Sequence, residues 1–393
     1  MLKDLKTLIG LNSAAFMMML GVGMTMAILP QRIINLTGSG SAVGYIASAF
    51  AISYIVLQVP IGNLSDKLGF KFFLVLGYLL CGITGLLYYF SNNVNLIFLG
   101  RVFQGAGEAP IWALAPALLS IKFSNSKGKV IGIYNTAIHI GLAMGPILGI
   151  FVLEIWTANQ AFLFYAFTCL IGAIITLVTV DNGANNKVPN NQMIHFKNIL
   201  VLMDDRKILV VLAGIMLYGA GYGIFLTVIP AYLISVRGFS QTFIGLFFSL
   251  FYLAISLSQI ITGHLSDKMG REKFMINGLV IAALGLSIFS GFNQPWISII
   301  LTLVSVGLGV FYLSSMAFLN EMVPNSLKGT ISGSYYLFWG IGFFFGPVFI
   351  GKLGELPGFN IGFYVYSITL TLLGVSMFFI YKKGSVRKKE ISR

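Results

Sequence analysis

Charged residues are scarce in this chain, and their scarcity excludes several classes of protein. Only 9% of its 393 residues are charged, whereas an ordinary soluble domain has about 25%. Because so few charges cannot form a polar shell around a protein of this size, a soluble enzyme and a disordered chain are both excluded. Hydrophobic residues make up 57% of the chain and the mean hydropathy is +0.89, which indicates a polytopic membrane protein.

Cysteine and histidine are rare as well, which argues against a disulfide scaffold and a structural metal site. The two cysteines, Cys81 and Cys169, both lie in apolar runs, where buried thiols are expected. These cysteines and the three histidines show no metal-ligand spacing, so we expect no metal. The sequence also lacks a Gly-x-x-x-x-Gly-Lys phosphate loop and a nucleophile placed beside a base. We therefore expect neither an enzyme nor an ATP-driven pump.

Twelve apolar runs predict an all-α integral membrane protein with twelve transmembrane helices. A bilayer core of about 30 Å requires about 20 apolar residues in each helix, and these runs are too long and continuous for the strands of a barrel. The first run is too long for a signal-peptide core, so we expect it to remain as a helix. The predicted spans cover residues 8–30, 42–63, 72–90, 95–121, 129–153, 160–180, 207–235, 241–264, 272–291, 296–322, 326–353 and 359–382.

The basic residues indicate a membrane topology rather than a nucleic-acid surface. The net charge is +13, but Lys and Arg fall in short segments between apolar runs and in a basic tail. Twenty-one of them lie at the termini and in alternate connecting segments, against three (Arg32, Arg237 and Lys352) on the opposite side. Under the positive-inside rule both termini are cytoplasmic. We expect a multi-pass protein of the plasma membrane, in a bacterium the inner (cytoplasmic) membrane, without a nucleic-acid partner.

A polar segment and an internal repeat divide the chain. The predicted N-terminal six-helix half covers residues 1–180 and the C-terminal half residues 206–382, with a cytoplasmic linker over 181–205 and a basic cytoplasmic tail over 383–393.

The repeat relates the two halves at a constant offset. The run Gly62–Gly69 recurs as Gly263–Gly270, and Gly145–Pro146 recurs as Gly346–Pro347, both at an offset of 201 residues. Two pseudo-symmetric six-helix halves are the architecture of many secondary transporters, whose substrate site lies at mid-membrane.

Three motifs resemble signatures of one family. The loop over 62–71 is similar to the cytoplasmic loop signature of the major facilitator superfamily, except that Phe70 stands where a basic residue is usual. The run RVFQGAG over 101–107 is similar to its proton-transfer motif. The run GLAMGPILG over 141–149 is similar to its antiporter signature, with Ile150 in place of a further Gly. The resemblance covers the whole chain and implies the fold of this superfamily, in particular its drug/proton antiporter branch.

The resemblance implies that the repeated loop is a gate motif at the cytoplasmic side. Each copy places an acid beside a lysine at a helix end, where the acid can accept hydrogen bonds from free amides of a neighbouring helix. The alternative is that these residues only shape a tight, solvated turn. The predicted gate residues are Gly62, Asp66, Lys67, Gly69 and Lys71 in the first copy, and Asp267, Lys268, Gly270 and Arg271 in the second.

Glycines recur every four residues in the antiporter motif. Gly141, Gly145 and Gly149 expose the backbone on one helix face and allow another helix to approach closely, while Pro146 removes a backbone donor. Ordinary small-residue packing is one interpretation. The other adds that this contact must open and close during transport.

Glu108 is the one acid clearly inside a predicted span, at the middle of 95–121. Arg101, Gln104 and Glu108 stand at i, i+3 and i+7 and share one helix face. A charge at the centre of a lipid-facing helix costs at least about 2.5–3.5 kcal/mol, so we expect Glu108 to face a central cavity as coupling site, cation counter-charge, or both. A structural Arg101–Glu108 pair is the alternative, although about 10 Å of helix separates the two residues.

His139 lies near the centre of the span 129–153, with Asn135 one turn away on the same face. Because histidine titrates near neutral pH, a Glu108–His139 proton relay is one interpretation. A histidine bonded to a neighbouring helix is the other.

Aromatic and amide side chains on several spans are further candidates for lining the cavity. Aromatic faces near an acid suit a lipophilic cation, whereas the alternative is packing or anchoring at the membrane interface. These candidates are Tyr54, Gln58, Trp112, Asn135, Tyr218, Tyr222, Tyr252, Gln259, Tyr312, Tyr335 and Trp339.

Together these patterns predict a proton-coupled antiporter that exports small amphipathic or cationic compounds by alternating access, as multidrug-efflux proteins do. The proton gradient is the expected energy source, and no cofactor is expected. The alternatives are a dedicated exporter of one endogenous metabolite such as a metallophore, peptide or sugar, then an uptake symporter, and then a membrane sensor that does not transport. The expected partners are a small-molecule substrate, protons and the lipid bilayer, and we expect a monomer without an obligate protein partner.

Overall fold

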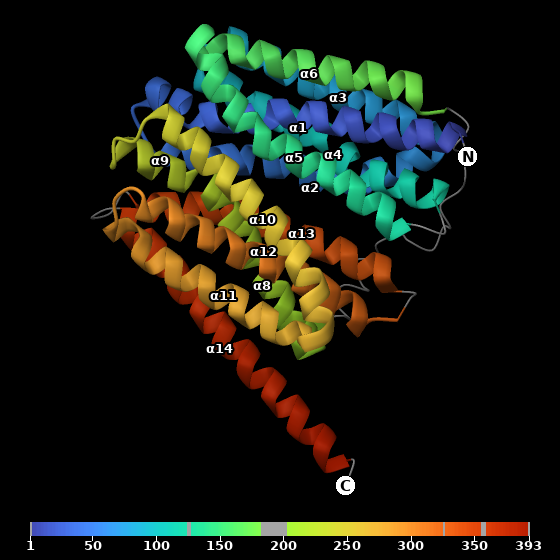
Figure 1. The fold of residues 1–393 in the computed structure, drawn as a ribbon, viewed down its shortest axis with the longest axis vertical. Helices are drawn as coiled ribbons and strands as arrows, with labels where there is room; N and C mark the ends of the chain where they lie inside the picture. Colours follow the sequence, from blue (N-terminus) through green and yellow to red (C-terminus); the bar gives the residue numbers. More distant parts are fainter. Residues whose placement is uncertain (1, 124–126, 182–202, 325–326, 355–358, 392–393) are drawn as a thin grey trace. The chain divides into compact units, whose positions relative to one another are not determined.

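The chain is helical throughout the part that its structure, a computed structural model, describes (Figure 1). That part comprises residues 2–123, 127–181, 203–324, 327–354 and 359–391. Within these ranges the elements are all helices and no strand occurs, which confirms the predicted all-α class.

Long apolar runs account for the long helices. Within the described ranges, eleven segments are long and apolar enough to cross a membrane, and they correspond to every predicted span except 95–121. That span is helix α4 (Val94–Lys122), which has 29 residues but is less apolar because it carries Arg101, Gln104 and Glu108. The most polar of the predicted spans is therefore the one that holds the candidate coupling residue.

The predicted span 207–235 is two helices rather than one. Helix α8 (Arg206–Leu226) and helix α9 (Val228–Ser235) are separated at Thr227, whose φ of −133° and ψ of −63° leave the helical region. Pro230 is the third residue of α9. It lacks a backbone N–H, and its ring crowds the carbonyl four residues earlier, which weakens a continuous helix at this point.

The first compact unit comprises Met1–Pro189 and Leu226–Leu253. Besides α4 and α9, its helices are α1 (Leu2–Thr37), η1 (Ser41–Gly44), α2 (Tyr45–Leu68), α3 (Phe70–Phe90), α5 (Lys127–Ile155), α6 (Ala158–Thr179) and the first part of α10 (Gln241–Met269). α1 packs along α5 and α6, while α4 packs between α2 and α3. This packing places the polar face of α4 against α2 and α3.

The second compact unit comprises Asn190–Phe225 and Ala254–Arg393. Besides α8 and the rest of α10, its helices are α11 (Arg271–Ile288), η3 (Phe289–Gly291), α12 (Trp296–Met322), α13 (Lys328–Leu353) and α14 (Phe359–Ile391). α11 packs on α12 and α14, and α13 packs on α14.

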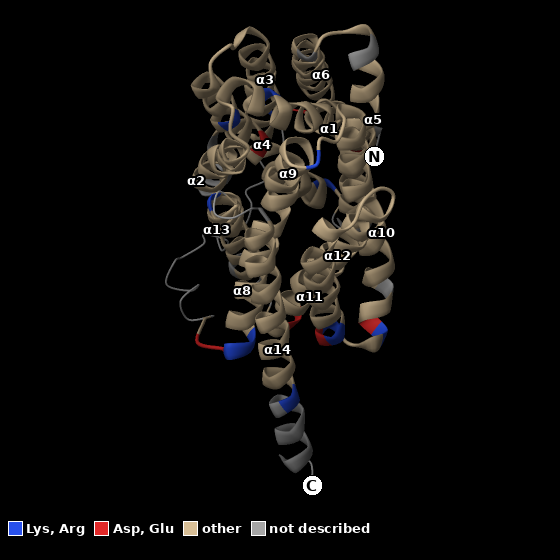
Figure 2. Cartoon of the chain, turned by 90° about the vertical axis from the view of Figure 1, so that its left-hand side faces the viewer, with Lys and Arg blue, Asp and Glu red and all other residues tan. Residues whose placement is uncertain are grey.

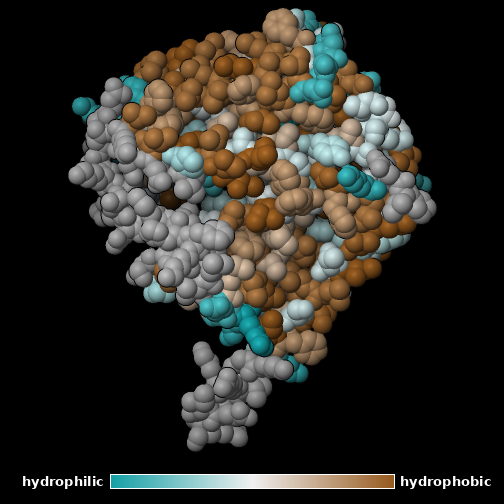
Figure 3. Space-filling view, turned by 180° about the vertical axis from the view of Figure 1, so that it is seen from behind, coloured by the Kyte–Doolittle hydropathy of each residue, from teal (hydrophilic) through white to brown (hydrophobic). Residues whose placement is uncertain are grey.

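The outer faces of both units are suited to lipid. Large apolar side chains are exposed on each, for example Phe72 and Leu177 in the first unit and Leu303 and Phe345 in the second. Most of the described surface is hydrophobic on the face drawn in Figure 3, and the charged residues in Figure 2 are few and lie mainly near helix ends. Soluble proteins rarely expose apolar surface on this scale.

Candidate functional site

Arg101, Gln104 and Glu108 form a continuous hydrogen-bonded row inside the first unit. Arg101 Nη1 donates to Gln104 Oε1 at 2.7 Å, and Gln104 Nε2 donates to Glu108 Oε1 at 2.9 Å. All three side chains are buried, with Gln104 fully enclosed. The charged groups of Arg101 and Glu108 are thus joined through the neutral amide of Gln104. This agrees with the separation of the two residues along the helix, which is too large for a direct ion pair.

Arg101 fixes which way the Gln104 amide points, and Tyr88 on α3 adds a second donor to the same oxygen. The Tyr88 hydroxyl donates to Gln104 Oε1 at 3.2 Å, so this oxygen accepts from two donors, Tyr88 and Arg101. A reversed amide would place its NH₂ against the Arg101 guanidinium, which cannot accept a hydrogen bond, and its oxygen against the Glu108 carboxylate, whereas the Tyr88 hydroxyl could accept from the reversed amide. The amide therefore has one favourable orientation, in which it donates to Glu108.

The second oxygen of Glu108 also has a donor. Trp112 Nε1 donates to Glu108 Oε2 at 3.1 Å from the next turn of α4. Both carboxylate oxygens therefore accept a hydrogen bond from a neutral N–H group. Both oxygens of an ionised carboxylate are thus provided with a donor, and a protonated Glu108 could still accept these two bonds while its new O–H would need an acceptor of its own.

Helix α2 holds the Arg101 guanidinium. Arg101 Nε donates to the backbone oxygen of Ile46 at 3.1 Å, and its Cζ lies 4.9 Å from the centroid of the Phe50 ring. Phe50 in turn stacks on Tyr54 with ring centroids 5.4 Å apart. Sequence reasoning identified Tyr54 but missed Ile46, Phe50 and Tyr88, because single-sequence spacing does not show contacts between helices.

Two glycines of the 101–107 motif let α4 approach its neighbours. A Cβ at Gly105 would collide with the Phe50 carbonyl oxygen on α2. A Cβ at Gly107 would lie 2.6 Å from the Gly77 carbonyl oxygen and 2.7 Å from Cys81 Sγ, both on α3. These close approaches bring α2 and α3 within reach of Arg101 and Gln104.

His139 and Asn135 lie half-exposed on α5. The described hydrogen-bond donors to Glu108 are Gln104 and Trp112 rather than His139. The Glu108–His139 relay therefore stays a prediction.

The antiporter-motif glycines form the contact between α5 and α1. A Cβ at Gly141 would lie 2.7 Å from the Phe16 carbonyl oxygen, and one at Gly145 would lie 2.7 Å from the Met24 backbone nitrogen. Gly149 faces Met24 as well, and Pro146 Cδ comes close to Gly23 of α1. α5 continues as one helix through Pro146.

The repeated copy makes the same kind of contact in the second unit. A Cβ at Gly342 of α13 would collide with the Met216 carbonyl oxygen of α8, and one at Gly346 would collide with Ala220. The sequence repeat thus corresponds to a repeated close helix pair, α1 with α5 and α8 with α13.

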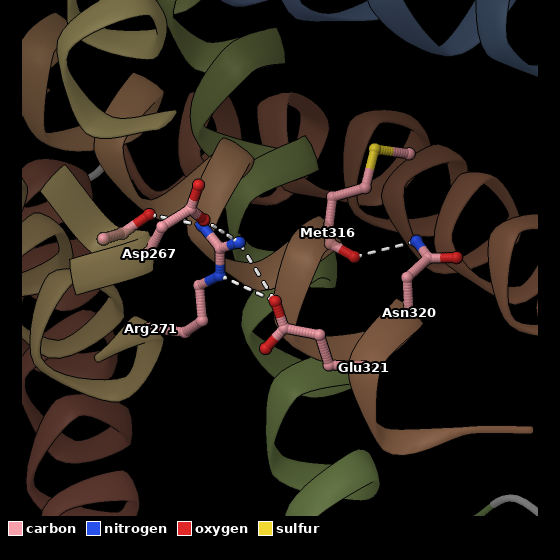
Figure 4. Close-up of polar contacts among 6 residues, drawn as sticks. Asp267, Arg271, Met316, Asn320 and Glu321 are labelled. Atoms are coloured by element: carbon pink, nitrogen blue, oxygen red, sulfur yellow. Dashed lines mark hydrogen bonds and ion pairs between the residues drawn. The ribbon is translucent and has the colours of Figure 1, made fainter. Parts of the chain in front are cut away.

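The second copy of the gate motif forms an ion cluster (Figure 4). Arg271 pairs with Asp267 of α10, and its Nε and Nη2 contact Glu321 Oε1 of α12 at 3.1 and 3.0 Å. Arg271 Nη1 also donates to Ser266 Oγ at 2.6 Å. Lys268 is exposed, and Gly270 has φ of 96°, which joins α10 to α11 through a turn that suits glycine.

The first copy is described only in part. Gly69 has φ of 86° and its N–H donates to the Ser65 carbonyl at 2.9 Å, while Lys71 is half-exposed. The side chains of Asp66 and Lys67, and the surroundings of Gly62, lie outside the described residues.

Five of the cavity candidates gather in the second unit. Tyr218 and Tyr222 of α8, Tyr312 of α12, and Tyr335 and Trp339 of α13 form one group of ring contacts. Tyr252, by contrast, is buried against Phe251 in the first unit, and Gln58 and Gln259 are half-exposed.

Comparison with known proteins identifies the family. The sequence model of the Major Facilitator Superfamily matches residues 11–241 and 211–393, which together span almost the whole chain. The chain belongs to the Major Facilitator Superfamily. It is therefore a multi-pass membrane transporter of small molecules rather than an enzyme.

Several relatives in the superfamily match over nearly their whole length. An uncharacterized MFS-type transporter of Methanocaldococcus jannaschii is 27% identical over 87% of this chain and 90% of its own. Multidrug resistance protein 1 of Bacillus subtilis is 25% identical over 96% of each chain. The quinolone resistance protein NorA of Staphylococcus aureus is 23% identical over 95% of this chain and 96% of its own.

Solved structures of superfamily transporters share the fold. The nucleoside transporter NupG superposes with a TM-score of 0.79 at 16% identity, over 97% of this chain and 100% of its own. A peptide transporter, POT, in complex with sulfate superposes with a TM-score of 0.78 at 13% identity, over 96% of this chain and 94% of its own. At these identities the likeness concerns the fold alone, and it confirms the predicted twelve-helix architecture.

Proposed function

We propose that this chain is a proton-coupled multidrug-type antiporter that exports small amphipathic or cationic compounds. The observation that carries the proposal is the buried carboxylate of Glu108, held by Gln104 and Trp112 in the middle of α4. An ionisable group inside a membrane helix is costly, so a carboxyl group in this position is best explained by a functional role.

Proton and cation compete for the same carboxylate. With Glu108 ionised, both oxygens accept their hydrogen bonds and the negative charge attracts a cation. When a proton binds one oxygen, the negative charge that attracts the cation is lost, and the two hydrogen bonds become weaker because their acceptor is neutral. The negative coupling between two positive ligands at one carboxylate is reciprocal, so each promotes release of the other.

The transport cycle follows from that competition. A proton from outside binds Glu108, and the cation leaves to the outside. After the halves reorient, the proton leaves to the cytoplasm and the ionised carboxylate binds the next cation. The proton gradient supplies the energy, and the cycle needs no cofactor.

The relatives support the direction and breadth of transport. Two of them are named for multidrug or quinolone resistance, and a transporter lowers the amount of a drug in the cell by exporting it. We accordingly place this chain in a bacterial cytoplasmic membrane as a single-chain transporter, with both termini in the cytoplasm as the distribution of Lys and Arg predicts.

A dedicated exporter of an anionic or zwitterionic metabolite is less well supported. Such a cargo needs an available cation, and Arg101 is the one Lys or Arg residue that lies away from the ends of the predicted spans. Its guanidinium is already bonded to Ile46 and Gln104 and covered by Phe50.

A proton-flux assay tests the proposal. Purified protein is reconstituted in liposomes that contain a pH-sensitive dye, and tetraphenylphosphonium or a zwitterionic dipeptide is then added. We expect proton movement with the cation, its loss in Glu108→Gln, and its retention in Glu272→Gln, where the acid lies on α11 outside the row. Proton movement evoked only by the dipeptide, or unchanged in Glu108→Gln, would overturn the proposal.

A further inference from the structure

We infer that the interior of the first unit carries protons between Glu108 and the C-terminal ends of α4 and α6, along thiols and hydroxyls of α3 and α6 and the water that they bind. The inference rests on the proposed proton coupling at Glu108 and adds the route that the proton takes. The groups of this route are Cys81 and Tyr78 on α3, and Cys169 and Thr176 on α6. We call this set the polar column.

The internal repeat shows that the fold does not need polar residues at these positions. The ring contact Tyr88–Phe162 between α3 and α6 recurs as Phe289–Phe363 between α11 and α14, at an offset of 201 residues. Equivalent helices of the second unit thus pack without these thiols and hydroxyls, so packing alone does not account for the polar column. At the same offset its members correspond to buried apolar residues, namely Leu279, Ala282, Leu370 and Met377.

The same comparison applies to the candidate coupling residue on α4. The close backbone contact Gly77–Gly107 between α3 and α4 recurs as Gly278–Gly307 between α11 and α12. With these contacts aligned, Glu108 corresponds to Leu308, which is buried. The carboxyl group and the polar column therefore occur together in the first unit, and apolar side chains take the place of both in the second.

The polar column begins beside the row on α4. A Cβ at Gly107 would lie 2.7 Å from Cys81 Sγ, and this thiol donates to the Gln104 carbonyl oxygen at 3.9 Å. The Cys81 and Cys169 thiols contact each other, and Cys169 also interacts electrostatically with Glu108. Since α3 packs on both α4 and α6, the two thiols connect the surroundings of Glu108 with the interface between α3 and α6.

The next part of the polar column is a pair of buried hydroxyls. Tyr78 interacts with both thiols and with Thr176, and its ring lies 2.8 Å from the place that a Cβ at Gly172 of α6 would occupy. Both side chains are fully buried, yet neither Tyr78 Oη nor Thr176 Oγ1 is in a hydrogen bond with a described residue. Buried hydroxyls are costly to leave unpaired, and internal water commonly satisfies them. The two hydroxyls therefore form a binding site for water.

The polar column ends close to charged groups at the helix ends. Thr176 lies three residues from the end of α6 at Thr179, about 4.5 Å along the axis. Asp181 follows α6, and its Oδ2 lies 3.9 Å from Nζ of Lys122, the last residue of α4. The Asp181 side chain is 54% exposed, so it can exchange protons with solvent. The distribution of Lys and Arg predicts that this end is cytoplasmic, which is the side where the proposed cycle releases its proton.

The groups of the polar column suit a proton relay, because thiols, hydroxyls and water both donate and accept. The O–H bond of protonated Glu108 breaks as its proton passes to a sulfur or oxygen of the polar column. That group gives its own proton to the next one, and the last water gives a proton to Asp181 or to solvent. One proton leaves Glu108 and one appears at the exit, and each thiol and hydroxyl on the way ends neutral.

The rate at which Glu108 loses its proton tests the inference. The full-length protein in detergent is brought rapidly from acidic to neutral pH, and infrared spectroscopy follows the carboxylic C=O band that is absent from Glu108→Gln. This measurement needs neither a substrate nor a membrane gradient. The test variants are Tyr78→Phe and Thr176→Val, each of which removes one hydroxyl with little change in volume.

Thr84→Val is the matched control. The Thr84 hydroxyl is also buried, but it donates to the carbonyl oxygens of Leu80 and Gly100. Gly100 precedes Glu108 by eight residues, about 12 Å along α4, whereas the polar column runs toward the other end of that helix. The control therefore removes a buried hydroxyl that lies outside the inferred route.

We expect each test variant to slow proton loss about twofold to tenfold, the change in rate that corresponds to one net hydrogen bond. Thr84→Val should not change the rate. The double variant should be slowed by less than the product of the two single effects, because both hydroxyls hold the same water. The pH midpoint of the C=O band should not move, since Gln104 and Trp112 still donate to Glu108, and a Tm close to the wild-type value shows that each variant is folded.

Unchanged rates in both test variants, or equal slowing in Thr84→Val, would overturn the inference, because the proton then leaves Glu108 by another route. The liposome assay separates this outcome from the proposed function. Cation-evoked proton movement that requires Glu108 but is unaffected by Tyr78→Phe and Thr176→Val would retain the antiport and reject the polar column. Slower proton loss in both test variants, without cation-evoked movement in liposomes, would retain the polar column and reject the antiport.

Discussion

Tyr88 and Gln104 lie on different helices, and the hydroxyl of Tyr88 donates to Gln104 Oε1 across 3.2 Å. The same oxygen accepts from Arg101 at 2.7 Å. Because the guanidinium cannot accept a hydrogen bond, the amide oxygen lies on its side and the nitrogen donates to Glu108, while the phenol on α3 holds the same oxygen as a second donor. Tyr88 is therefore a positioning residue, which acts on Glu108 through the amide.

Replacement of Tyr88 by Phe should weaken the folded state and disturb coupling. The ring remains in place against Phe162, and only the hydrogen bond is lost. Because Arg101 still bonds the amide, we expect a loss of about 0.5–1.5 kcal/mol in the free energy of unfolding, the usual net value of one hydrogen bond. Unfolding in mixed micelles titrated with SDS measures it, and the pH profile of cation-evoked proton movement should change.

Tyr78 provides the matched control on the same helix. It is fully buried, and its hydroxyl has no hydrogen-bond partner among the described residues. Tyr78→Phe should therefore leave the free energy of unfolding unchanged or raise it, and should not alter the pH profile. Equal effects of the two substitutions would contradict the positioning role of Tyr88.

Replacement of Gln104 by Leu should have a larger effect than replacement of Tyr88. It removes the acceptor of Arg101 and one donor of Glu108 together, and it leaves two buried charged groups short of a partner. We expect a loss on the order of 3 kcal/mol in the free energy of unfolding. The same SDS titration measures this loss, and Gln259→Leu, at a half-exposed position, is the control. Similar losses in both variants would show that the hydrogen-bonded row of Arg101, Gln104 and Glu108 does not stabilise the fold.

The sequence predicts α4 better than it predicts what surrounds it. Arg101, Gln104 and Glu108 follow one another at helical spacing on one face, and the structure joins them in that order. Tyr88 could not be found in this way because its partner lies on another helix, and nothing in a single sequence marks which tyrosine of α3 faces α4.

The same distinction applies to the helices and the ion cluster. Apolar runs predict where helices lie, but the break at Thr227 falls within an otherwise apolar stretch, and the averaged pattern conceals it. Arg271 was predicted at the gate motif, whereas Glu321 was not, since fifty residues separate the pair and only the packing of α10, α11 and α12 brings them together.

The Arg271 cluster should contribute little to stability, and its contribution should depend on salt. The Arg271 side chain is 15% exposed, but Asp267 and Glu321 are 57% and 58% exposed, so water screens both pairs. We expect Arg271→Ala to lower the free energy of unfolding by about 1 kcal/mol or less at low salt, and by less at high salt. Lys273→Ala, at an exposed position two residues away, should have no such effect, and a loss that does not depend on salt would count against an electrostatic role.

Gly145→Ala tests whether the antiporter motif is required for the contact between α5 and α1. A Cβ at this position would collide with the Leu20 carbonyl oxygen and lie 2.7 Å from the Met24 backbone nitrogen, so backbone rather than a flexible side chain must move. Overpacking of this kind costs about 1–3 kcal/mol, which exceeds the gain in helix propensity of about 1 kcal/mol from replacing Gly by Ala. We therefore expect a lower Tm and slower transport. Gly132→Ala is the matched control on α5, because a Cβ there meets no atom within 4 Å. This control variant should have an unchanged or higher Tm. If Gly145→Ala also raised the Tm, α1 and α5 would have room to separate in the folded state.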